Sequence, residues 1–191
     1  MQGPVDSPSP WVARFAPLMP PGEALDLACG GGRHTRLLAR LGHPVVALDR
    51  DPQALARSAG EGVETVEADL EAPGAAWPFA PGRFAGIVVT NYLHRPLFAD
   101  IARALAPGGI LIYETFALGN ERYGKPSNPA FLLAPGELLD VARAAGLRVV
   151  AYEDGVLLDG RAARVQRLCA AAPAFDWHRA RLDHLVAGLD A

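Results

Sequence analysis

The chain has 191 residues, half of them hydrophobic, and a formal net charge of −3 at pH 7. That length fits one domain of common size with a real hydrophobic core. The acidic balance argues against a broad cationic surface for nucleic acid, and no apolar run approaches the ~20 residues that span a bilayer. The composition therefore favours a soluble, enzyme-sized domain over a nucleic-acid-binding or membrane protein.

Residues 1–10 do not contain a charged region followed by an apolar stretch, so no secretory signal is expected. The two cysteines, Cys29 and Cys169, predict reduced thiols rather than a disulfide framework. We therefore expect a cytoplasmic protein. Neither cysteine is an expected nucleophile, because the sequence around Cys29 offers no obvious activating base.

Strand-like and helical segments alternate along the chain, which is typical of a parallel sheet covered on both faces. An N-terminal arm comes first, with apolar residues at helical spacing from residue 11 to residue 18. Strands are expected at 24–28, 45–48, 63–68, 84–90 and 110–116, and helices at 33–41, after the second strand through 59, at 96–105 and at 135–145. The proline-bearing stretch 71–82 is expected to be a loop. Two final strands, at 147–153 and 164–170, are expected to form a hairpin across Gly155 and Gly160.

The tail, residues 175–191, has apolar residues at helical spacing, which predicts an amphipathic helix. We expect an N-terminal arm or cap at 1–22, a main domain at 23–172, and this helix at 173–191 as part of the same domain. The helix packs on the domain or forms an oligomer contact, and a monomer and a homodimer both remain open.

The most informative stretch is residues 24–35, ALDLACGGGRHT, an apolar run with one acidic residue, a glycine-dense turn and a helical pattern. Glycines allow positive φ angles and let a ligand approach without a Cβ in the way. The following helix presents unpaired N–H groups to such a ligand. A dinucleotide fingerprint fails because Thr35 stands where its third glycine belongs, and the only lysine, Lys125, lies too far downstream for a P-loop.

The segment Asp26-Leu27-Ala28-Cys29-Gly30-Gly31-Gly32 resembles the first motif of class I S-adenosylmethionine-dependent methyltransferases, with Ala28 in place of its first glycine. The order of strands and helices is similar to that family's sheet over roughly residues 24–172, and the turn at 106–109 resembles the one before its fifth strand. The resemblance implies an α/β, three-layer Rossmann-like sandwich. Its seven-stranded sheet would be mostly parallel, with the last strand antiparallel.

The resemblance also implies S-adenosylmethionine as cofactor and S-adenosylhomocysteine as product. It places the ribose contact on Asp49, after the second strand, and the adenine contact on Asp69, after the third. A ribose diol is a pair of donors that a carboxylate accepts strongly, although Asp49 has the alternative of capping the next helix. Arg33 is expected to pair with the cofactor's carboxylate or to be a surface charge. The expected cofactor-binding residues are Asp26, Ala28, Cys29, Gly30, Gly32, Arg33, Asp49, Arg50, Asp69, Leu70 and Asn91.

The tetrad Asn91-Tyr92-Leu93-His94 follows the fourth strand, where the family places the residues nearest the transferable methyl group. It lacks the paired prolines of many nucleobase methyltransferases, which argues against a base as acceptor. His94 is the candidate general base because its ordinary pKa is near neutrality, and Tyr92 is a second candidate catalytic residue. His94 has the alternative of capping a helix near Pro96, and an anionic soft nucleophile needs no base.

Substrate contacts are expected from two segments. The polar loop 117–129 suits a mobile lid, with Arg122 and Tyr123 facing the substrate, and Tyr113 points either to the site or to the core. Trp11 and Phe15 of the N-terminal arm are expected to close over the site, with plain packing as the alternative. No metal ligands are expected.

Within the family, the Gly-Arg-His ending of the turn and residues 131–138 resemble small bacterial tellurite-resistance methyltransferases. No inserted recognition domain is visible, so a small molecule or metalloid oxyanion is the preferred acceptor. Arginines 161, 164 and 167 are expected to solvate a sheet face, and RNA binding is a minority view. An RNA or protein methyltransferase and a non-catalytic S-adenosylmethionine-binding module remain alternatives. An NAD-dependent oxidoreductase is the least favoured.

Overall fold

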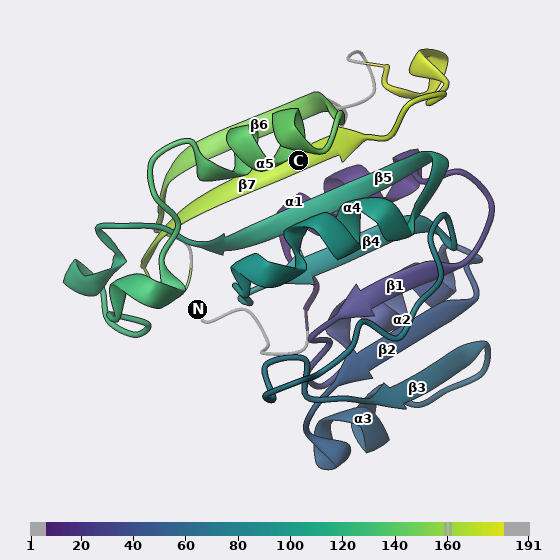
Figure 1. The fold of residues 1–191 in the computed structure, drawn as a ribbon, viewed down its shortest axis with the longest axis horizontal. Coiled ribbons are helices and arrows are strands. Elements are labelled where there is room, and N and C mark those ends of the chain that lie inside the picture. Colours follow the sequence, from purple (N-terminus) through teal and green to yellow (C-terminus); the bar gives the residue numbers. More distant parts are fainter. Residues whose placement is uncertain (1–6, 159, 161, 182–191) are drawn as a thin grey trace.

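The computed structural model describes residues 7–158, 160 and 162–181, and one seven-stranded sheet forms its centre (Figure 1). The strand order is β3-β2-β1-β4-β5-β7-β6. The strands are β1 (Ala24–Leu27), β2 (Val45–Asp49), β3 (Val63–Glu67), β4 (Phe84–Thr90), β5 (Leu105–Phe116), β6 (Arg148–Leu157) and β7 (Ala163–Ala171). Neighbours from β3 to β5 pair in parallel, and β7 pairs antiparallel with both β5 and β6. The expected α/β sandwich with a mostly parallel sheet and an antiparallel last strand is confirmed.

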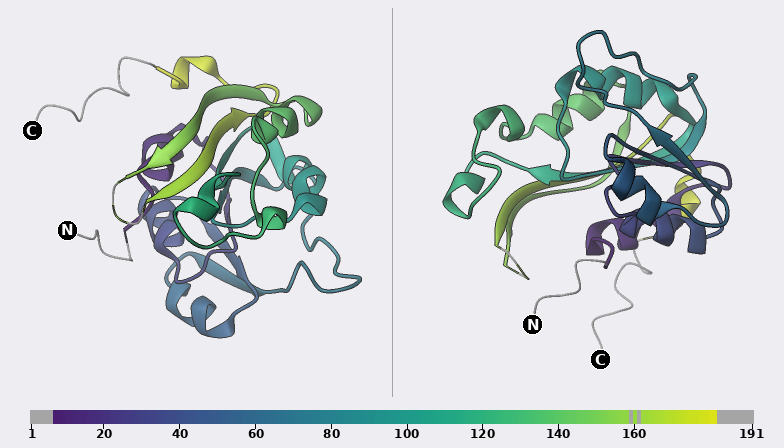
Figure 2. Two further views of the ribbon diagram at one scale, coloured as in Figure 1. Left: turned by 90° about the vertical axis from the view of Figure 1, so that its left-hand side faces the viewer. Right: turned by 90° about the horizontal axis from the view of Figure 1, so that it is seen from below.

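Helices cover both faces of the sheet, as Figure 2 shows in its view from below. The α-helices are α1 (Pro10–Phe15), α2 (Arg33–Arg40) and α3 (Pro52–Ser58) on one face and α4 (Phe98–Ala104) and α5 (Glu137–Ala144) on the other. Short 3-10 turns are Ala16–Leu18, Arg95–Leu97, Asn120–Arg122, Pro129–Phe131 and Trp177–Arg179. Right-handed crossovers explain the two layers, because the chain moves outward from β1 to β3 and then in the opposite direction from β4 onward.

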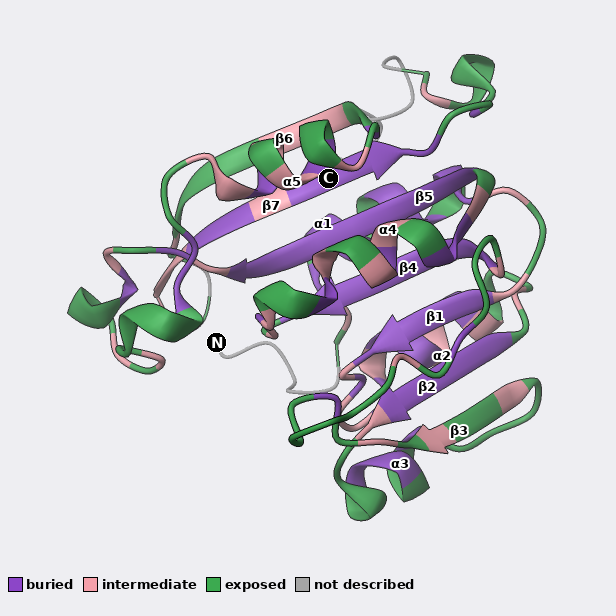
Figure 3. Cartoon of the chain, in the orientation of Figure 1, coloured by how far each residue is buried: buried purple, intermediate pink, exposed green. Residues whose placement is uncertain are grey.

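The inner strands are buried along their length, whereas the edge strands β3 and β6 are largely exposed (Figure 3). All residues of β1 and β4 are buried, which is typical of parallel strands covered on both faces. Alternate side chains enter two apolar clusters. Leu25 and Ile87 pack in the cluster that includes α4 and α5, and Ala24 and Val88 pack in the cluster that includes α1 and α2.

Helix α1 packs in the apolar core. Trp11 and Phe15 are 2% and 0% exposed, with ring centroids 4.5 Å apart. Trp11 Nε1 donates a hydrogen bond to the carbonyl oxygen of Leu168 in β7, at 3.3 Å. The helical spacing expected in the arm is therefore correct. Of the two alternatives for Trp11 and Phe15, the structure has plain packing, because the apolar cluster encloses both rings.

Strand pairing places the start of β5 and the end of β6 at other residues than expected. β5 begins at Leu105 instead of residue 110, because Leu105 pairs with Phe84 ahead of a shift in register. β6 continues to Leu157 instead of ending at residue 153, because Gly155 pairs with Val165. Residues 71–82 contain neither helix nor strand, as the prolines predict.

The described part of the tail is not an α-helix. It holds the 3-10 turn Trp177–Arg179, preceded by Phe175, which is buried in the cluster around α1. Arg179 donates to the backbone carbonyls of Leu18 and Met19, at 3.2 and 2.7 Å. These contacts hold the tail in an irregular conformation. Residues 182–191, which carry the apolar stripe of the predicted helix, lie outside the described residues.

The start of β5 offers a test of close backbone packing. A Cβ on Gly109 would lie 2.9 Å from the carbonyl oxygen of Ala106 and 3.0 Å from that of Phe84. We expect Gly109→Ala to lower the free energy of unfolding by about 1–3 kcal/mol, because these backbones must move apart. Denaturant unfolding measures the change. Gly155→Ala is the matched control, since a Cβ there meets nothing within 4 Å, and equal losses in both variants would contradict the packing explanation.

Candidate functional site

The turn between β1 and α2 is wound in the left-handed region. Ala28, Gly30 and Gly32 have φ angles of +55°, +53° and +76°. Glycine adopts such angles at no steric cost, whereas alanine does so at some strain. Ala28 stands where the resembling family has its first glycine. Its positive φ angle explains why glycine suits that position.

The surroundings of the turn differ on its two sides. A Cβ on Gly32 would lie 2.5 Å from Cβ of Ser58, so α3 packs directly against the turn. A Cβ on Gly30 would meet nothing within 4 Å. Arg36 fastens the packed side, since its Nη1 donates to the carbonyl of Gly31 at 2.7 Å and to that of Arg57 at 3.4 Å. The turn is therefore held rigidly on one side and is open on the other, as a ligand that approaches backbone requires.

Asp26 supports this turn from within the protein. The residue is 1% exposed, and its Oδ2 accepts a 2.6 Å hydrogen bond from Thr35 Oγ1 in α2. Burial raises the pKa of Asp26 to about 6, against the opposing effects of Thr35 and Arg33. The side chain of Asp26 is turned into the packing below the turn and lines neither of the hollows described below, so its expected cofactor contact stays a prediction.

Asp49, at the end of β2, faces the open side of the turn. Its Oδ2 accepts from the N–H of Gly30 at 2.8 Å, and its Oδ1 accepts from the N–H of Asp51 at 3.0 Å. A carboxylate oxygen has two acceptor positions, so each oxygen keeps one for a ligand. The residue that caps α3 is Asp51, which accepts from the N–H of Gln53. The structure therefore assigns the capping role to Asp51 and leaves Asp49 in position to bind a diol.

Two hollows adjoin at the end of β1, and we call them the acidic and the basic hollow. The acidic hollow measures about 170 Å³ and is lined by Leu27, Ala28, Leu48, Asp49, Arg50, Ala68, Asp69, Leu70, Glu71 and Tyr92. The basic hollow measures about 480 Å³ and is lined by Ala28, Cys29, Gly30, Gly31, Arg33, Arg57, Thr90, Asn91 and Tyr92. Ala28 and Tyr92 line both, so they lie at the boundary.

The segment after β4 forms the wall shared by the hollows. Asn91 is left-handed, with φ +54°, and its N–H donates to the carbonyl of Glu114 in β5 at 2.9 Å. Tyr113 is buried, and its hydroxyl donates to the carbonyl of Tyr92 at 2.9 Å. Of the two alternatives for Tyr113, the structure has the one in which the side chain points to the core, where its hydroxyl positions Tyr92. Burial and the neighbouring carboxylates, Glu71 foremost, raise the pKa of Tyr92.

A buried polar network lies beside the basic hollow. His34 is 1% exposed, its Nε2 accepts from the N–H of Ser9 at 3.0 Å, and its Nδ1 lies 3.3 Å from Thr90 Oγ1. Because Nε2 accepts, a neutral ring carries its proton on Nδ1 and donates it to Thr90. Ser9 Oγ donates to Glu114 Oε2 at 2.9 Å, and Arg167 Nε lies 3.0 Å from the same oxygen. Thr90 lines the hollow, so the network fixes one of its walls.

Other expected site residues lie outside both hollows. His94 is half-buried, and its backbone carbonyl accepts from the N–H of Leu97. Arg122 and Tyr123 belong to a lobe of two 3-10 turns beyond β5, where Tyr123 is exposed. Gly32 is packed against α3 and lines neither hollow. Among the described residues, no three His, Cys, Asp or Glu side chains are grouped to hold a metal ion.

Seven lining residues were not among the expected site residues. Leu27, Leu48 and Ala68 lie at the ends of expected strands, and the other four are Gly31, Arg57, Glu71 and Thr90. Gly31 sits inside the recognised turn, Glu71 follows Asp69 by two positions, and Thr90 precedes the tetrad. These three had a signal, since each adjoins an expected residue. Arg57 had none, because it reaches the hollow from the far end of α3.

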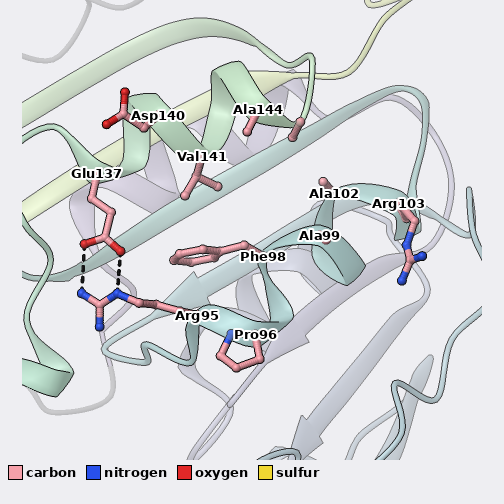
Figure 4. A pocket seen from close by; sticks show the side chains of 11 residues that line it. Arg95, Pro96, Phe98, Ala99, Ala102, Arg103, Glu137, Asp140, Val141 and Ala144 are labelled. Atoms are coloured by element: carbon pink, nitrogen blue, oxygen red, sulfur yellow. Dashed lines mark hydrogen bonds and ion pairs between the residues drawn. The ribbon is translucent and has the colours of Figure 1, made fainter.

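A larger apolar groove of about 860 Å³ lies on the opposite face, between α4 and α5. Figure 4 shows Phe98 and Val141 facing each other across it. The ion pair between Arg95 and Glu137, at 2.7 Å, bounds one end. The groove contains none of the expected site residues, so we do not assign it to the cofactor.

Comparison with protein families decides what this arrangement is. Residues 24–109, from β1 to the start of β5, match the family described as the methyltransferase domain. Over these residues the chain belongs to the methyltransferase-domain family. The matched residues include the glycine turn, Asp49, Asp69 and the tetrad after β4.

Relatives and solved structures agree with the methyltransferase family. A trans-aconitate 2-methyltransferase of Azoarcus sp. is 31% identical over 145 residues, which are 71% of this chain and 53% of that protein. The chain spans about half the length of the curated relatives it matches. A SAM-dependent methyltransferase of Methanosarcina mazei superposes with a TM-score of 0.66 at 16% identity, covering 89% of this chain and 100% of that one. TehB from Haemophilus influenzae superposes with a TM-score of 0.66 at 20% identity, covering 84% of this chain and 61% of that one. Both structures share the fold of class I methyltransferases.

The site fits the cofactor of class I methyltransferases, S-adenosylmethionine, in its donors and acceptors. Asp49 would hold the ribose diol with its remaining acceptor positions, and Asp69 adjoins it in the same acidic hollow. The open side of Gly30 leaves the backbone accessible, since even a Cβ there would meet no atom. Arg33 lines the basic hollow and would pair with the methionine carboxylate.

The buried residue His34 makes the stability of the protein depend on pH. Burial, aided by Arg33, lowers the pKa of His34 from 6.5 to about 3. Below pH 6.5 the unfolded chain binds a proton that the folded chain does not, so the free energy of unfolding falls as pH decreases toward 3. The slope approaches about 1.4 kcal/mol per pH unit.

We therefore expect wild-type protein to lose more stability than His34→Gln between pH 7 and pH 5, as measured by denaturant unfolding at each pH. The raised pKa of Asp26 acts in the opposite direction but is present in both proteins, so it cancels in the difference. Stability curves that stay parallel across this range would contradict a neutral buried His34.

Proposed function

We propose that the protein transfers the methyl group of S-adenosylmethionine to a small-molecule acceptor, a class that includes metalloid oxyanions. The observation that carries the proposal is the placement of Asp49. Its carboxylate is fixed by the N–H groups of Gly30 and Asp51, faces the open side of the turn, and keeps acceptor positions for a diol. A carboxylate engaged only in capping α3 would not support it, and Asp51 performs that task.

The chain's part in this reaction is to bind, to align and to exclude water. S-adenosylmethionine, when bound, supplies the activated methyl group. In the proposal the acidic hollow takes the adenosine part, and the methionine part lies over Ala28 and Gly30 toward the basic hollow. Asn91 and Tyr92 then stand beside the methyl group, because they form the wall of the basic hollow.

The proposal also assigns roles to Tyr92, to His94 and to residues of the lobe beyond β5. Tyr92 contacts the reacting groups, and its position is set by the hydrogen bond from Tyr113 to its carbonyl. His94 would remove a proton only from an acceptor that carries one, and an anionic acceptor needs no base. Arg122 and Tyr123, on the lobe beyond β5, face the acceptor from the same edge of the sheet.

The arginines of β7 favour a small acceptor over RNA, because carboxylates neutralise their charges. Arg164 pairs with Asp154, and Arg167 lies between Glu114 and Glu153, so these two do not form a free cationic surface. Arg161 lies outside the described residues. No helix in residues 7–158 and 162–181 is long and apolar enough to cross a membrane. Trans-aconitate, named for one relative, is a small acceptor of the kind proposed.

Calorimetric titration with S-adenosylhomocysteine tests the cofactor site. Asp49→Ala is expected to weaken its binding roughly 10-fold or more, because a charge-assisted hydrogen bond contributes about 1.5–3 kcal/mol. Asp51→Ala is the matched control. It removes the cap of α3 and costs about 1 kcal/mol of stability while leaving S-adenosylhomocysteine affinity within about twofold. Equal weakening in the two variants would show that Asp49 acts through the helix, and no binding to wild-type protein would overturn the proposed function.

A further inference from the structure

The basic hollow has a charge that the cofactor does not balance. Its lining contains two guanidinium groups, Arg33 and Arg57, and no carboxylate. Neither guanidinium forms an ion pair or hydrogen bond with an acidic side chain among residues 7–158, 160 and 162–181. Arg95 and Arg164, in contrast, each pair with a carboxylate.

Arg57 is held beside the glycine turn by specific contacts. Its backbone carbonyl accepts from Arg36 Nη1, which also binds the carbonyl of Gly31. The next residue, Ser58, is buried and packs against Gly32. As a result, Arg57 Nε lies 3.5 Å from the position that a Cβ on Gly31 would take. The guanidinium group is thus placed over the turn and at the margin of the hollow.

The charges of the cofactor leave one of these arginines without a partner. Its methionine part carries one carboxylate, one ammonium and, in the methyl donor, one sulfonium. A single guanidinium, that of Arg33, suffices for the carboxylate. The second guanidinium and the sulfonium then both favour a negative group in the remaining space.

The hollow also lacks a base that would take a proton from an acceptor at neutral pH. The lining residues with an ionisable proton, apart from the arginines, are Cys29 and Tyr92. Burial raises the pKa of Cys29 to about 12 and also raises the pKa of Tyr92, so both keep their protons. His94 does not line the hollow. An acceptor that enters it must therefore arrive deprotonated.

We propose that the methyl acceptor is an oxygen anion, a carboxylate or a metalloid oxyanion, and that Arg57 is the residue that selects it. This inference rests on the proposed function. The two acceptor classes share planar or clustered oxygens that accept from a guanidinium group. In the transfer, a lone pair of the anion forms the new bond to the methyl carbon as the carbon–sulfur bond breaks. The electron pair of that bond returns to sulfur, which leaves a neutral thioether, and no proton is removed.

Calorimetry on the full chain distinguishes the role of each arginine. Two cofactor probes are used: S-adenosylhomocysteine, and 5′-methylthioadenosine, which lacks the amino acid part. Succinate and selenite are then titrated into protein saturated with S-adenosylhomocysteine, with dimethyl succinate as the uncharged control. We expect at least one of the two anions to bind the saturated wild-type protein and dimethyl succinate not to bind. Which anion binds separates the carboxylate from the oxyanion source.

Arg57→Gln is expected to weaken the anion roughly 10-fold, equivalent to losing one charge-assisted hydrogen bond, and to change S-adenosylhomocysteine affinity by less than about twofold. Arg33→Gln is expected to weaken S-adenosylhomocysteine but not 5′-methylthioadenosine. Arg40→Gln, an exposed substitution elsewhere on α2, is expected to change neither.

Three outcomes overturn the proposal. The first is wild-type protein that binds S-adenosylhomocysteine but neither anion, and the second is anion binding that Arg57→Gln leaves unchanged. The third is an Arg57→Gln variant that loses S-adenosylhomocysteine but keeps 5′-methylthioadenosine, which would assign Arg57 to the cofactor. A wild-type protein that binds neither adenosyl probe instead overturns the proposed function itself.

Discussion

The contact between the β1–α2 turn and α3 is the constraint on which the site depends. With a Cβ position on Gly32 only 2.5 Å from Ser58, no side chain fits between the turn and the helix. That contact, together with the left-handed angles at 28, 30 and 32, determines where the N–H of Gly30 points. The N–H meets Asp49, which β2 delivers at the same edge because β1 and β2 pair in parallel. The geometry of the candidate ligand site thus follows from strand direction and one close backbone approach.

The buried polar groups around this turn hold neighbouring elements in place, and no chemical step is assigned to them. Asp26 holds α2 through Thr35, and His34 joins the N–H of Ser9 to Thr90. Each is removed from water, which costs free energy unless hydrogen bonds replace the lost solvation. Both side chains form such hydrogen bonds. Burial also raises the pKa of Asp26 and lowers the pKa of His34, and each shift favours the uncharged form. The charged groups that remain near solvent, Asp49 and the two arginines, are the ones left for a ligand.

Local patterns in the sequence were enough for the architecture and for most of the lining of the two hollows. The acidic ends of 45–48 and 63–68 predicted Asp49 and Asp69 because parallel strands end at one edge. Such patterns did not predict the direction in which a side chain points. Asp26 and Tyr113 belong to expected strands, but alternation turns both toward packing, and the face is known only once neighbours are placed. Trp11 and Phe15 had correct helical spacing, yet the hydrogen-bond partner of Trp11 lies in β7, far along the chain. Arg57 reaches the site because α3 packs against the β1–α2 turn, and no residue spacing in the sequence indicates that contact.

The hydrogen bond from Trp11 to Leu168 joins the first helix to the last strand. When a ribosome makes this chain, α1 emerges long before its partner exists, so its apolar face must wait while more than a hundred residues follow. The segment with the cofactor turn can associate earlier, since β1, β2 and β4 are near one another in sequence. The apolar cluster around α1 is then completed only after β7 has been made and inserts between β5 and β6.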